Sequence, residues 1–143
     1  MPATGEKTMH EHDTPEGRKA VFRALIDCYA RADVEAMAAL IAPDYRGHTS
    51  AGPRDWAEFR QSILNFHALF DYAPDSFVVE DQFVDGEKVA TRMTCTVRSK
   101  ETAEPMTMIG INLAVIRSGQ IVEEWNTWEM VAAPESLSVQ GAT

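Results

Sequence analysis

The sequence lacks several features that would assign it to a large class of proteins. No apolar run approaches the ~18 residues that a membrane helix needs, and residues 1–13 lack the basic-then-apolar order of a signal peptide, so we expect a cytoplasmic protein. The two cysteines, Cys28 and Cys95, have no metal-ligand spacing. We therefore expect buried, reduced thiols, with neither a disulfide nor a zinc site.

Positive charge is also scarce. The chain has 13 Lys and Arg residues against 22 Asp and Glu residues, which gives a formal net charge of −9. A negative surface repels phosphate backbones and anionic lipids. The charge therefore argues against binding to nucleic acid or to a membrane surface, and it favours a small neutral organic ligand.

The length of 143 residues fits one domain with a sizeable core. We assign residues 14–132 to this domain and predict disordered tails over residues 1–13 and 133–143. Three helices are predicted by capping residues that precede apolar residues at three- and four-residue spacing. The caps are Thr14, Asp33 and Asp55. The second helix is short and is expected to continue through Ile41 until Pro43 stops it.

The period changes from helical to strand-like after residue 75. Strands are predicted over residues 76–84, 87–99, 106–116 and 121–130, with Asp85-Gly86 and Ser118-Gly119 in the turns. A brief extended segment over residues 45–48 precedes the third helix. Helices followed by hairpin-connected strands predict an α+β fold, because α/β folds alternate strand and helix along the chain.

The last predicted strand carries an unusual number of polar groups, with three carboxylates and an amide among two tryptophans. Because side chains alternate along a strand, Glu124 and Asn126 share one face. Glu129 lies on the opposite face unless a bulge intervenes. Trp125 and Trp128 also point to opposite faces, so at most one of them can stack on a ligand.

Three segments together resemble the SnoaL-like polyketide cyclase family over residues 16–130: residues 85–94, Gly110-Ile111-Asn112 and residues 118–126. They combine an Arg on the strand after an Asp-Gly turn, a Gly-x-polar strand and a Gly-x-Ile-Val-Glu-x-Trp segment. The resemblance implies the NTF2-like fold, in which a curved antiparallel sheet wraps around three N-terminal helices to form a cone with a deep pocket, commonly as a homodimer. Ketosteroid isomerases and limonene epoxide hydrolases share this superfamily, so the fold alone does not fix the reaction.

The resemblance also implies acid–base chemistry on a small hydrophobic carbonyl substrate, namely ring closure by aldol condensation without metal or cofactor. The characterised cyclases carry an aspartate at the position of Asn126, and an amide cannot titrate. The predicted base is therefore Glu129 or Glu124. Asn126 and Asn112 are the predicted positioning donors, and His48 is an auxiliary proton carrier.

Arg92 is predicted to pair with a carboxylate, either in the pocket or in a structural ion pair. The predicted substrate-binding residues are Tyr29, Phe66, Met93, Met108, Asn112 and Trp125. Two alternatives stay open. One is a non-catalytic module for small-molecule binding or dimerisation, and the other is a limonene-type epoxide hydrolase, in which Arg92, Glu124 and Asn126 would help to position a water.

Overall fold

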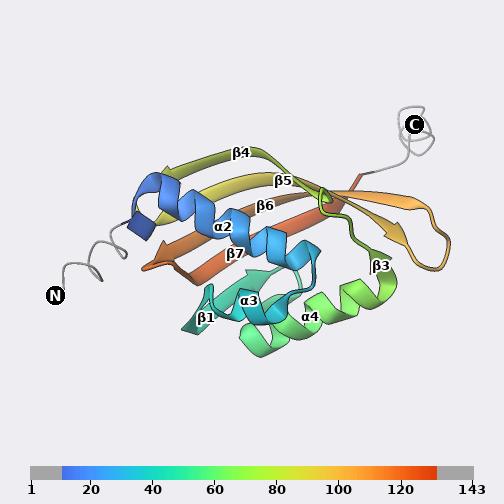
Figure 1. Cartoon of the computed structure of the whole chain (residues 1–143), viewed down its shortest axis with the longest axis horizontal. Helices are drawn as coiled ribbons and strands as arrows, with labels where there is room; N and C mark the ends of the chain where they lie inside the picture. Colours follow the sequence, from blue (N-terminus) through green and yellow to red (C-terminus); the bar gives the residue numbers. More distant parts are fainter. Residues whose placement is uncertain (1–10, 132–143) are drawn as a thin grey trace.

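The computed structural model describes residues 11–131, and the predictions for residues 1–10 and 132–143 lie outside the described residues. The elements are α2 (Pro15–Ala30), α3 (Val34–Ala38), β1 (Ile41–Thr49), β2 (Gly52–Arg54), α4 (Trp56–Leu69), β3 (Phe70–Asp71), β4 (Phe77–Asp85), β5 (Lys88–Ser99), β6 (Pro105–Arg117) and β7 (Gln120–Met130). The long strands β4 to β7 form a curved sheet, and α2 lies across it (Figure 1).

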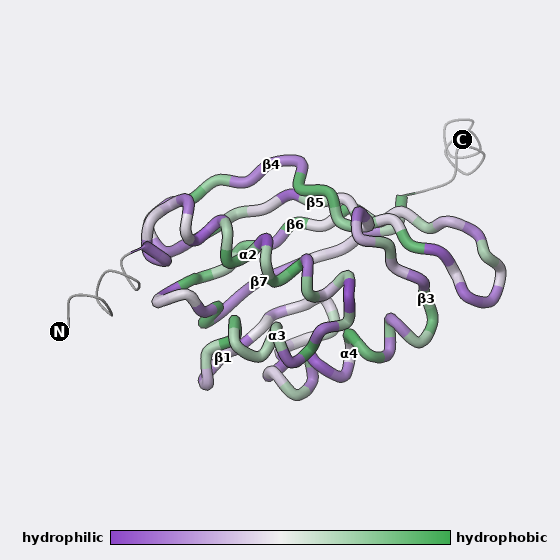
Figure 2. Tube along the Cα trace, viewed as in Figure 1, coloured by the Kyte–Doolittle hydropathy of each residue, from purple (hydrophilic) through white to green (hydrophobic). Residues whose placement is uncertain are grey.

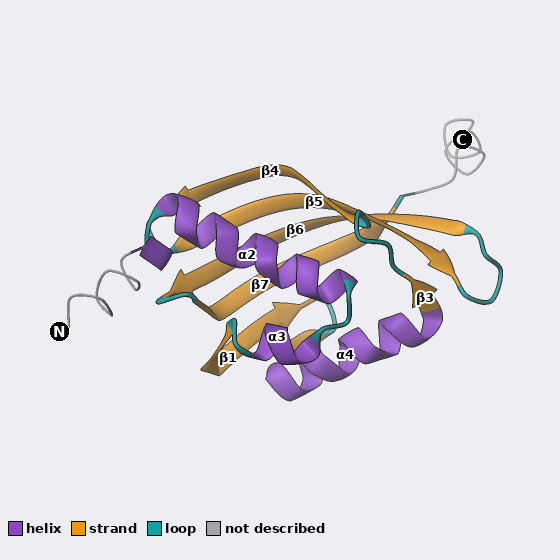
Figure 3. Cartoon of the chain, viewed as in Figure 1, coloured by secondary structure: helices purple, strands orange, loops and turns teal. Residues whose placement is uncertain are grey.

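The strands form one sheet in the order β2-β1-β7-β6-β5-β3, and β4 also pairs with β5. The predicted α+β cone is confirmed, with α2, α3 and α4 on the same side of the sheet (Figure 3). The sheet is not wholly antiparallel, because β1 runs parallel to β7. This parallel pair places Gly47 opposite Glu124, which becomes important for the site below.

The three predicted helix starts are confirmed by their side-chain caps. Thr14 Oγ1 accepts a hydrogen bond from the Gly17 amide at 3.0 Å, and Asp33 Oδ1 accepts one from the Ala36 amide at 3.1 Å. Asp55 forms a reciprocal capping box with Glu58 at the start of α4. Each cap satisfies an amide that has no partner within its helix.

The prediction for the second helix was wrong at its C-terminal end. The helix stops at Ala38, and Ile41 already belongs to β1, a strand of nine residues rather than the expected brief segment over residues 45–48. Pro43 lies inside this strand. The β1–β7 register shifts between Ile41 and Arg46, so Pro43 sits in an irregular stretch where a missing amide donor does not interrupt a regular ladder.

Asp13, just before the predicted domain boundary at residue 14, contacts two residues of the domain. Asp13 accepts a hydrogen bond from the Ser118 amide at 2.8 Å and forms an ion pair with Arg18 at 3.3 Å. These contacts join the N-terminal end of α2 to the β6–β7 turn. Asp13 therefore contacts the domain, and the boundary at residue 14 stays a prediction.

The core lies between the helices and the inner face of the sheet. Both hydrophobic and hydrophilic residues lie along the strands (Figure 2), and on β5 the buried set includes Val89, Met93, Cys95 and Val97, in agreement with the predicted alternation. Cys28 and Cys95 are both buried and free. Within residues 11–131, no helix is both long enough and apolar enough to cross a membrane.

Burial of Cys95 leads to a pH prediction. Desolvation raises the pKa of this thiol from 9.0 to about 12. Above about pH 9 the unfolded chain therefore loses a proton that the folded chain keeps, so this contribution to stability is complete below pH 9 and falls as the pH rises towards 12. Urea unfolding at about pH 8 and about pH 10 measures this effect. Between the two pH values, the free energy of unfolding should fall less for Cys95→Ala than for the parent.

The matched control is Thr96→Ala, which changes an exposed residue on the same strand. It should retain the pH dependence of the parent. Equal pH dependence in the parent and Cys95→Ala would contradict the prediction.

Candidate active site

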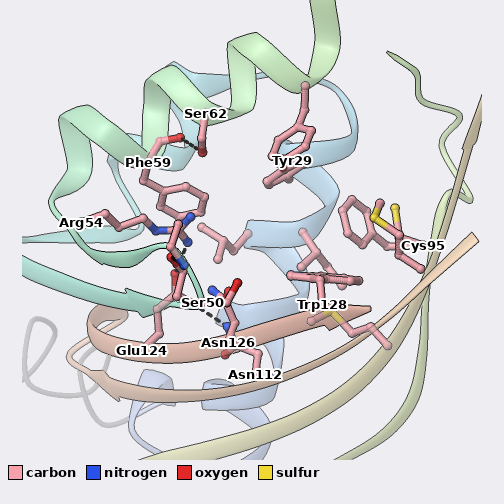
Figure 4. A pocket seen from close by; sticks show the side chains of 18 of the residues that line it. Tyr29, Ser50, Arg54, Phe59, Ser62, Cys95, Asn112, Glu124, Asn126 and Trp128 are labelled. Carbon is pink, nitrogen blue, oxygen red and sulfur yellow. Dashed lines mark hydrogen bonds and ion pairs between the residues drawn. The ribbon is translucent and has the colours of Figure 1, made fainter. Parts of the chain in front are cut away.

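A cavity of about 450 Å³ lies between the helices and the sheet. Most of its wall is apolar or aromatic, and the residues that contribute include Tyr29, Phe59, Phe66, Tyr72, Phe77, Met93, Met108 and Trp128. The polar residues in the same wall include Arg54, Asn112, Glu124 and Asn126 (Figure 4). The cavity thus joins a large apolar surface to a small group of hydrogen-bonding side chains, as is usual for small-molecule sites.

Glu124 is the centre of this polar group, and its residue surface is only 1% exposed. Its Oε1 accepts hydrogen bonds from the Tyr45 hydroxyl at 2.6 Å and from Arg54 Nη2 at 3.1 Å. Its Oε2 accepts one from Asn112 Nδ2 at 2.9 Å. Three donors from three different strands therefore provide the hydrogen bonds that water would give to an exposed carboxylate.

Tyr45 and Arg54 reach Glu124 from β1 and β2. Arg54 Nε also donates to the Tyr45 hydroxyl at 3.3 Å, and the guanidinium carbon lies 3.7 Å from the centre of the Phe59 ring. This cation–π contact holds the guanidinium over an apolar surface in the cavity. Burial and the adjacent Glu124 carboxylate raise the pKa of Tyr45, so its hydroxyl stays protonated and can donate.

Gly47 makes this convergence sterically possible. A Cβ atom at this position would lie 2.5 Å from the Tyr45 hydroxyl oxygen and 3.0 Å from Arg54 Nε. The position lies opposite Glu124 in the parallel β1–β7 pair. The absence of a side chain therefore leaves the space in which Tyr45 and Arg54 meet the carboxylate.

Asn112 and Asn126 lie directly opposite one another on β6 and β7, and both line the cavity. They share the inner face of the sheet with Glu124, in agreement with the alternation along the strands. The side chain of Asn112 is bonded to the carboxylate. That of Asn126 projects into the middle of the cavity (Figure 4).

Glu129 lies away from this group. It is exposed and pairs in register with Ile109 on the outer face of the sheet. The β6–β7 register is regular from Val115–Glu123 to Met108–Met130, so no bulge brings Glu129 to the inner face. Of the two predicted bases, Glu124 is therefore the one that lines the cavity.

Three further predicted residues do not line the cavity. His48 Nε2 lies 2.7 Å from Glu123 Oε2, and its ring stacks on that of Trp125 with a 5.0 Å centroid separation. Trp125 faces outward, and Trp128 is the tryptophan of β7 that lines the cavity. Arg92 forms an exposed ion pair with Asp81 at 2.7 Å. Strand alternation turns Arg92 and Trp125 away from the cavity, while His48 is held beside Trp125 on the neighbouring strand.

The other predicted binding residues, Tyr29, Phe66, Met93 and Met108, line the cavity together with Asn112. Burial raises the pKa of Tyr29 to about 12, which keeps its hydroxyl neutral near neutral pH. Within residues 11–131, no cluster of His, Cys, Asp and Glu side chains is arranged to hold a metal ion.

Sequence reasoning missed Tyr45, Arg54 and Trp128 as site residues. Tyr45 and Arg54 lie far from Glu124 along the chain, and only the parallel pairing of β1 with β7 brings them together. A signal was present in Tyr45-Arg46-Gly47, because a glycine two residues after a tyrosine on a strand leaves space beside that side chain. Trp128 shares the face of Glu124 and Asn126, so alternation alone would have found it.

Gly47→Ala should disrupt the network around Glu124. The added methyl group would collide with the Tyr45 hydroxyl and with Arg54, and overpacking of this kind costs about 1–3 kcal/mol. Urea unfolding of the parent and the variant measures the loss. In a Tyr45→Phe background the same change should cost less, because the hydroxyl oxygen in the closest contact is gone. An equal loss in both backgrounds would contradict the assigned collision.

Comparison with solved structures shows the same fold in several proteins. AclR, a proposed hydroxylase from Streptomyces galilaeus, matches with a TM-score of 0.75 and 16% identity over 90% of this chain and 92% of its own. IdmH, a proposed polyketide cyclase from Streptomyces antibioticus, matches with a TM-score of 0.67 and 26% identity over 87% of this chain and 98% of its own. An NTF2-like protein from Burkholderia xenovorans has a TM-score of 0.65 and 13% identity, covering 82% of this chain and 92% of its own.

No curated protein matches the chain significantly in sequence. The model of the SnoaL-like domain, in contrast, matches residues 22–124, which is more than half of the chain and ends at Glu124. Together with the NTF2-like architecture, this match shows that the chain belongs to the SnoaL-like domain family.

Proposed function

We propose that the protein is a cofactor-independent acid–base enzyme that acts on a small hydrophobic carbonyl compound, as a cyclase or an isomerase, with Glu124 as the base. The observation that carries the proposal is a buried carboxylate within hydrogen-bond distance of an amide in a mainly apolar cavity. Such a site suits removal of a proton from a carbon next to a carbonyl group.

The hydrogen bonds of Glu124 favour Oε2 as the proton acceptor. Oε1 already has two donors, Tyr45 and Arg54, whereas Oε2 receives one hydrogen bond from Asn112 among the described residues. A lone pair of Oε2 can therefore take a proton. Holding the carboxylate in one orientation also reduces the reorganisation needed during the reaction.

The enolate that forms needs hydrogen-bond donors around its oxygen. The amide of Asn126 and the neutral hydroxyl of Tyr29 line the same cavity and can supply them. The likeness to IdmH, a proposed polyketide cyclase, supports this class of chemistry. His48, Arg92 and Glu129 have no role in the proposal, because they do not line the cavity.

Epoxide hydrolysis fits the residues less well. It would use an Arg, an amide and two carboxylates, and the cavity brings Arg54 and Asn112 together with Glu124. The other carboxylate in the cavity wall, Glu58, is exposed and accepts the Asp55 amide in the cap of α4. A second carboxylate beside the Arg54–Glu124 pair is therefore missing from the wall formed by the described residues.

Glu124→Gln is the direct test, because it retains the shape of the side chain but removes the base. With 2-tetralone as the probe in D₂O, NMR should detect exchange of the protons next to the carbonyl in the presence of the parent, and the variant should lower the rate by roughly 100-fold or more. Glu129→Gln is the matched control on the outer face of the same strand and should keep the parent rate.

Equal exchange rates in the parent and Glu124→Gln would overturn the assignment of the base. If the parent binds the ketone with no exchange above the uncatalysed rate, the proposed catalysis is wrong for this class of compound. The non-catalytic binding module would then be the better description.

We also propose a homodimer that forms through the outer face of the sheet. Four large apolar side chains are 39–66% exposed there, namely Phe83, Ile109, Ile111 and Trp125. They are brought together by the β4–β5–β6–β7 register, in which Phe83 pairs with Ala90, Ala90 with Leu113, and Leu113 with Trp125. An apolar patch of this kind is typical of a protein interface, and a second copy supplies a matching apolar surface.

Ile111→Asp should convert the dimer to a monomer, because it places a charge in the middle of this patch. Sedimentation velocity measures the change. Leu69→Asp is the matched control, since Leu69 is also exposed, at 60%, but lies at the end of α4. A parent protein that sediments as a monomer would contradict the proposal.

A further inference from the structure

Arg54 is the only positively charged residue among the described residues that line the cavity. Two of its nitrogens are bonded, since Nη2 donates to Glu124 Oε1 at 3.1 Å and Nε donates to the Tyr45 hydroxyl at 3.3 Å. The remaining nitrogen, Nη1, has no acceptor among residues 11–131. All the nitrogens of a guanidinium carry N–H donors, so those of Nη1 remain for another partner.

Nη1 is accessible to a ligand. Among the buried and half-buried residues of the described chain, 11–131, the one unpaired side-chain nitrogen or oxygen that is closed off is Asn112 Oδ1. Arg54 is half-buried, so its unpaired Nη1 keeps accessible surface. The Phe59 ring covers a face of the guanidinium at 3.7 Å (Figure 4), whereas the N–H bonds point outward in the guanidinium plane. An acceptor in the cavity can therefore bond to Nη1.

The proposed reaction moves a negative charge past this group. Before the reaction, the charges of Arg54 and Glu124 balance each other. When the C–H bond next to the carbonyl breaks, the proton forms an O–H bond with Glu124 Oε2, and the electron pair of the broken bond becomes the enolate. Glu124 is then neutral, the substrate oxygen carries the negative charge, and the net charge of the cavity is unchanged. Arg54 thus loses its charged partner as a new anion forms.

We infer that Arg54 stabilises the enolate through Nη1 and is a catalytic residue of the proposed reaction. The inference rests on the proposed function, and it adds a charged donor to the neutral donors Asn126 and Tyr29. Hydrogen bonds between charged groups are roughly twice as strong as neutral ones. A donor that is held in place before the reaction also needs no reorganisation during it. Arg54 contributes little to binding of the neutral ketone, because Glu124 then balances its charge.

The test uses 2-naphthoate, an aromatic carboxylate that stands in for the enolate because its negative charge lies on oxygen atoms at the edge of a flat ring. Titration calorimetry near neutral pH measures its affinity for the parent and for Glu124→Gln. The carboxylate of Glu124 should repel the anion in the parent. Glu124→Gln leaves Arg54 without a counter-charge, so it should bind 2-naphthoate roughly tenfold more tightly or better.

A double variant, Glu124→Gln with Arg54→Met, shows whether Arg54 causes this gain. Removal of both charges together avoids a buried carboxylate without its cation, which would be strongly destabilising. The double variant should lose the gain in affinity. If it fails to fold, Arg54→Gln takes the place of Arg54→Met, and the same loss is expected.

The matched control is Glu124→Gln with Arg92→Met, which removes the same charge from the exposed pair of Arg92 and Asp81. It should keep the gain in affinity. Neutral 2-acetylnaphthalene should bind to all of these variants with similar affinity, which shows that the cavity is intact.

Arg54→Lys separates catalysis from binding in the exchange assay with 2-tetralone. Lysine keeps a positive charge near Glu124 but has a single nitrogen, so it cannot bond to the carboxylate and the enolate with the geometry of a guanidinium. It should lower kcat roughly tenfold while KM changes by less than about twofold. An unchanged kcat would overturn the inference.

Equal affinity of the two double variants for 2-naphthoate would also overturn it, as would failure of Glu124→Gln to bind 2-naphthoate at about millimolar concentration. These results are separate from the assignment of the base. Exchange that depends on Glu124, together with equal affinities, would leave the proposed function standing without Arg54. A gain that depends on Arg54, without exchange by the parent, would overturn the proposed function and keep Arg54 as the group that binds an anion.

Discussion

The buried charge of Glu124 is the constraint on which the site depends. A carboxylate that is 1% exposed must receive hydrogen bonds from the protein, because bulk water is excluded. That requirement explains why Tyr45, Arg54 and Asn112 converge on it from three strands. It also explains Gly47, where a methyl group would occupy the space in which two of these donors meet. The parallel pairing of β1 with β7 is thus part of the electrostatics of the cavity as well as part of the fold.

Much of the fold could be predicted because the signals are local. A cap such as Thr14, a turn such as Asp85-Gly86 and the alternation along β5 each depend on residues within a few positions of one another. The length of β1 could not be predicted in this way. Pro43 is a valid stop signal for a helix, and only the irregular β1–β7 register, formed with residues about 80 positions later, accommodates it in a strand. The same non-local pairing made the sheet mixed rather than antiparallel.

The candidate site, like the fold, has residues that local patterns predict and residues that depend on the pairing of distant strands. Alternation was sufficient to put Glu124 and Asn126 on one face, and it also argued against Glu129 and Trp125, which the structure has on the outer face. Glu129 and Trp125 were predicted as site residues because of their side-chain chemistry, although the alternation along the strand placed them on the opposite face from Glu124. Arg54 illustrates the opposite difficulty, since a short strand and a turn gave no reason to connect it with a carboxylate 70 residues later. Contacts between strands that lie far apart in the sequence are therefore the part of the site that a single sequence does not predict.

The position of the carboxylate also accounts for the amide at Asn126. The resemblance to the polyketide cyclases implies an aspartate at that position, whereas this chain carries its buried carboxylate two residues earlier, on the same face of β7. Side chains two residues apart on one face of a strand are separated by roughly 7 Å. Two carboxylates at that distance in an apolar cavity would repel each other, and the repulsion would oppose ionisation of both. An amide at Asn126 avoids this repulsion, and in the proposed function it supplies a donor for the oxygen of the substrate.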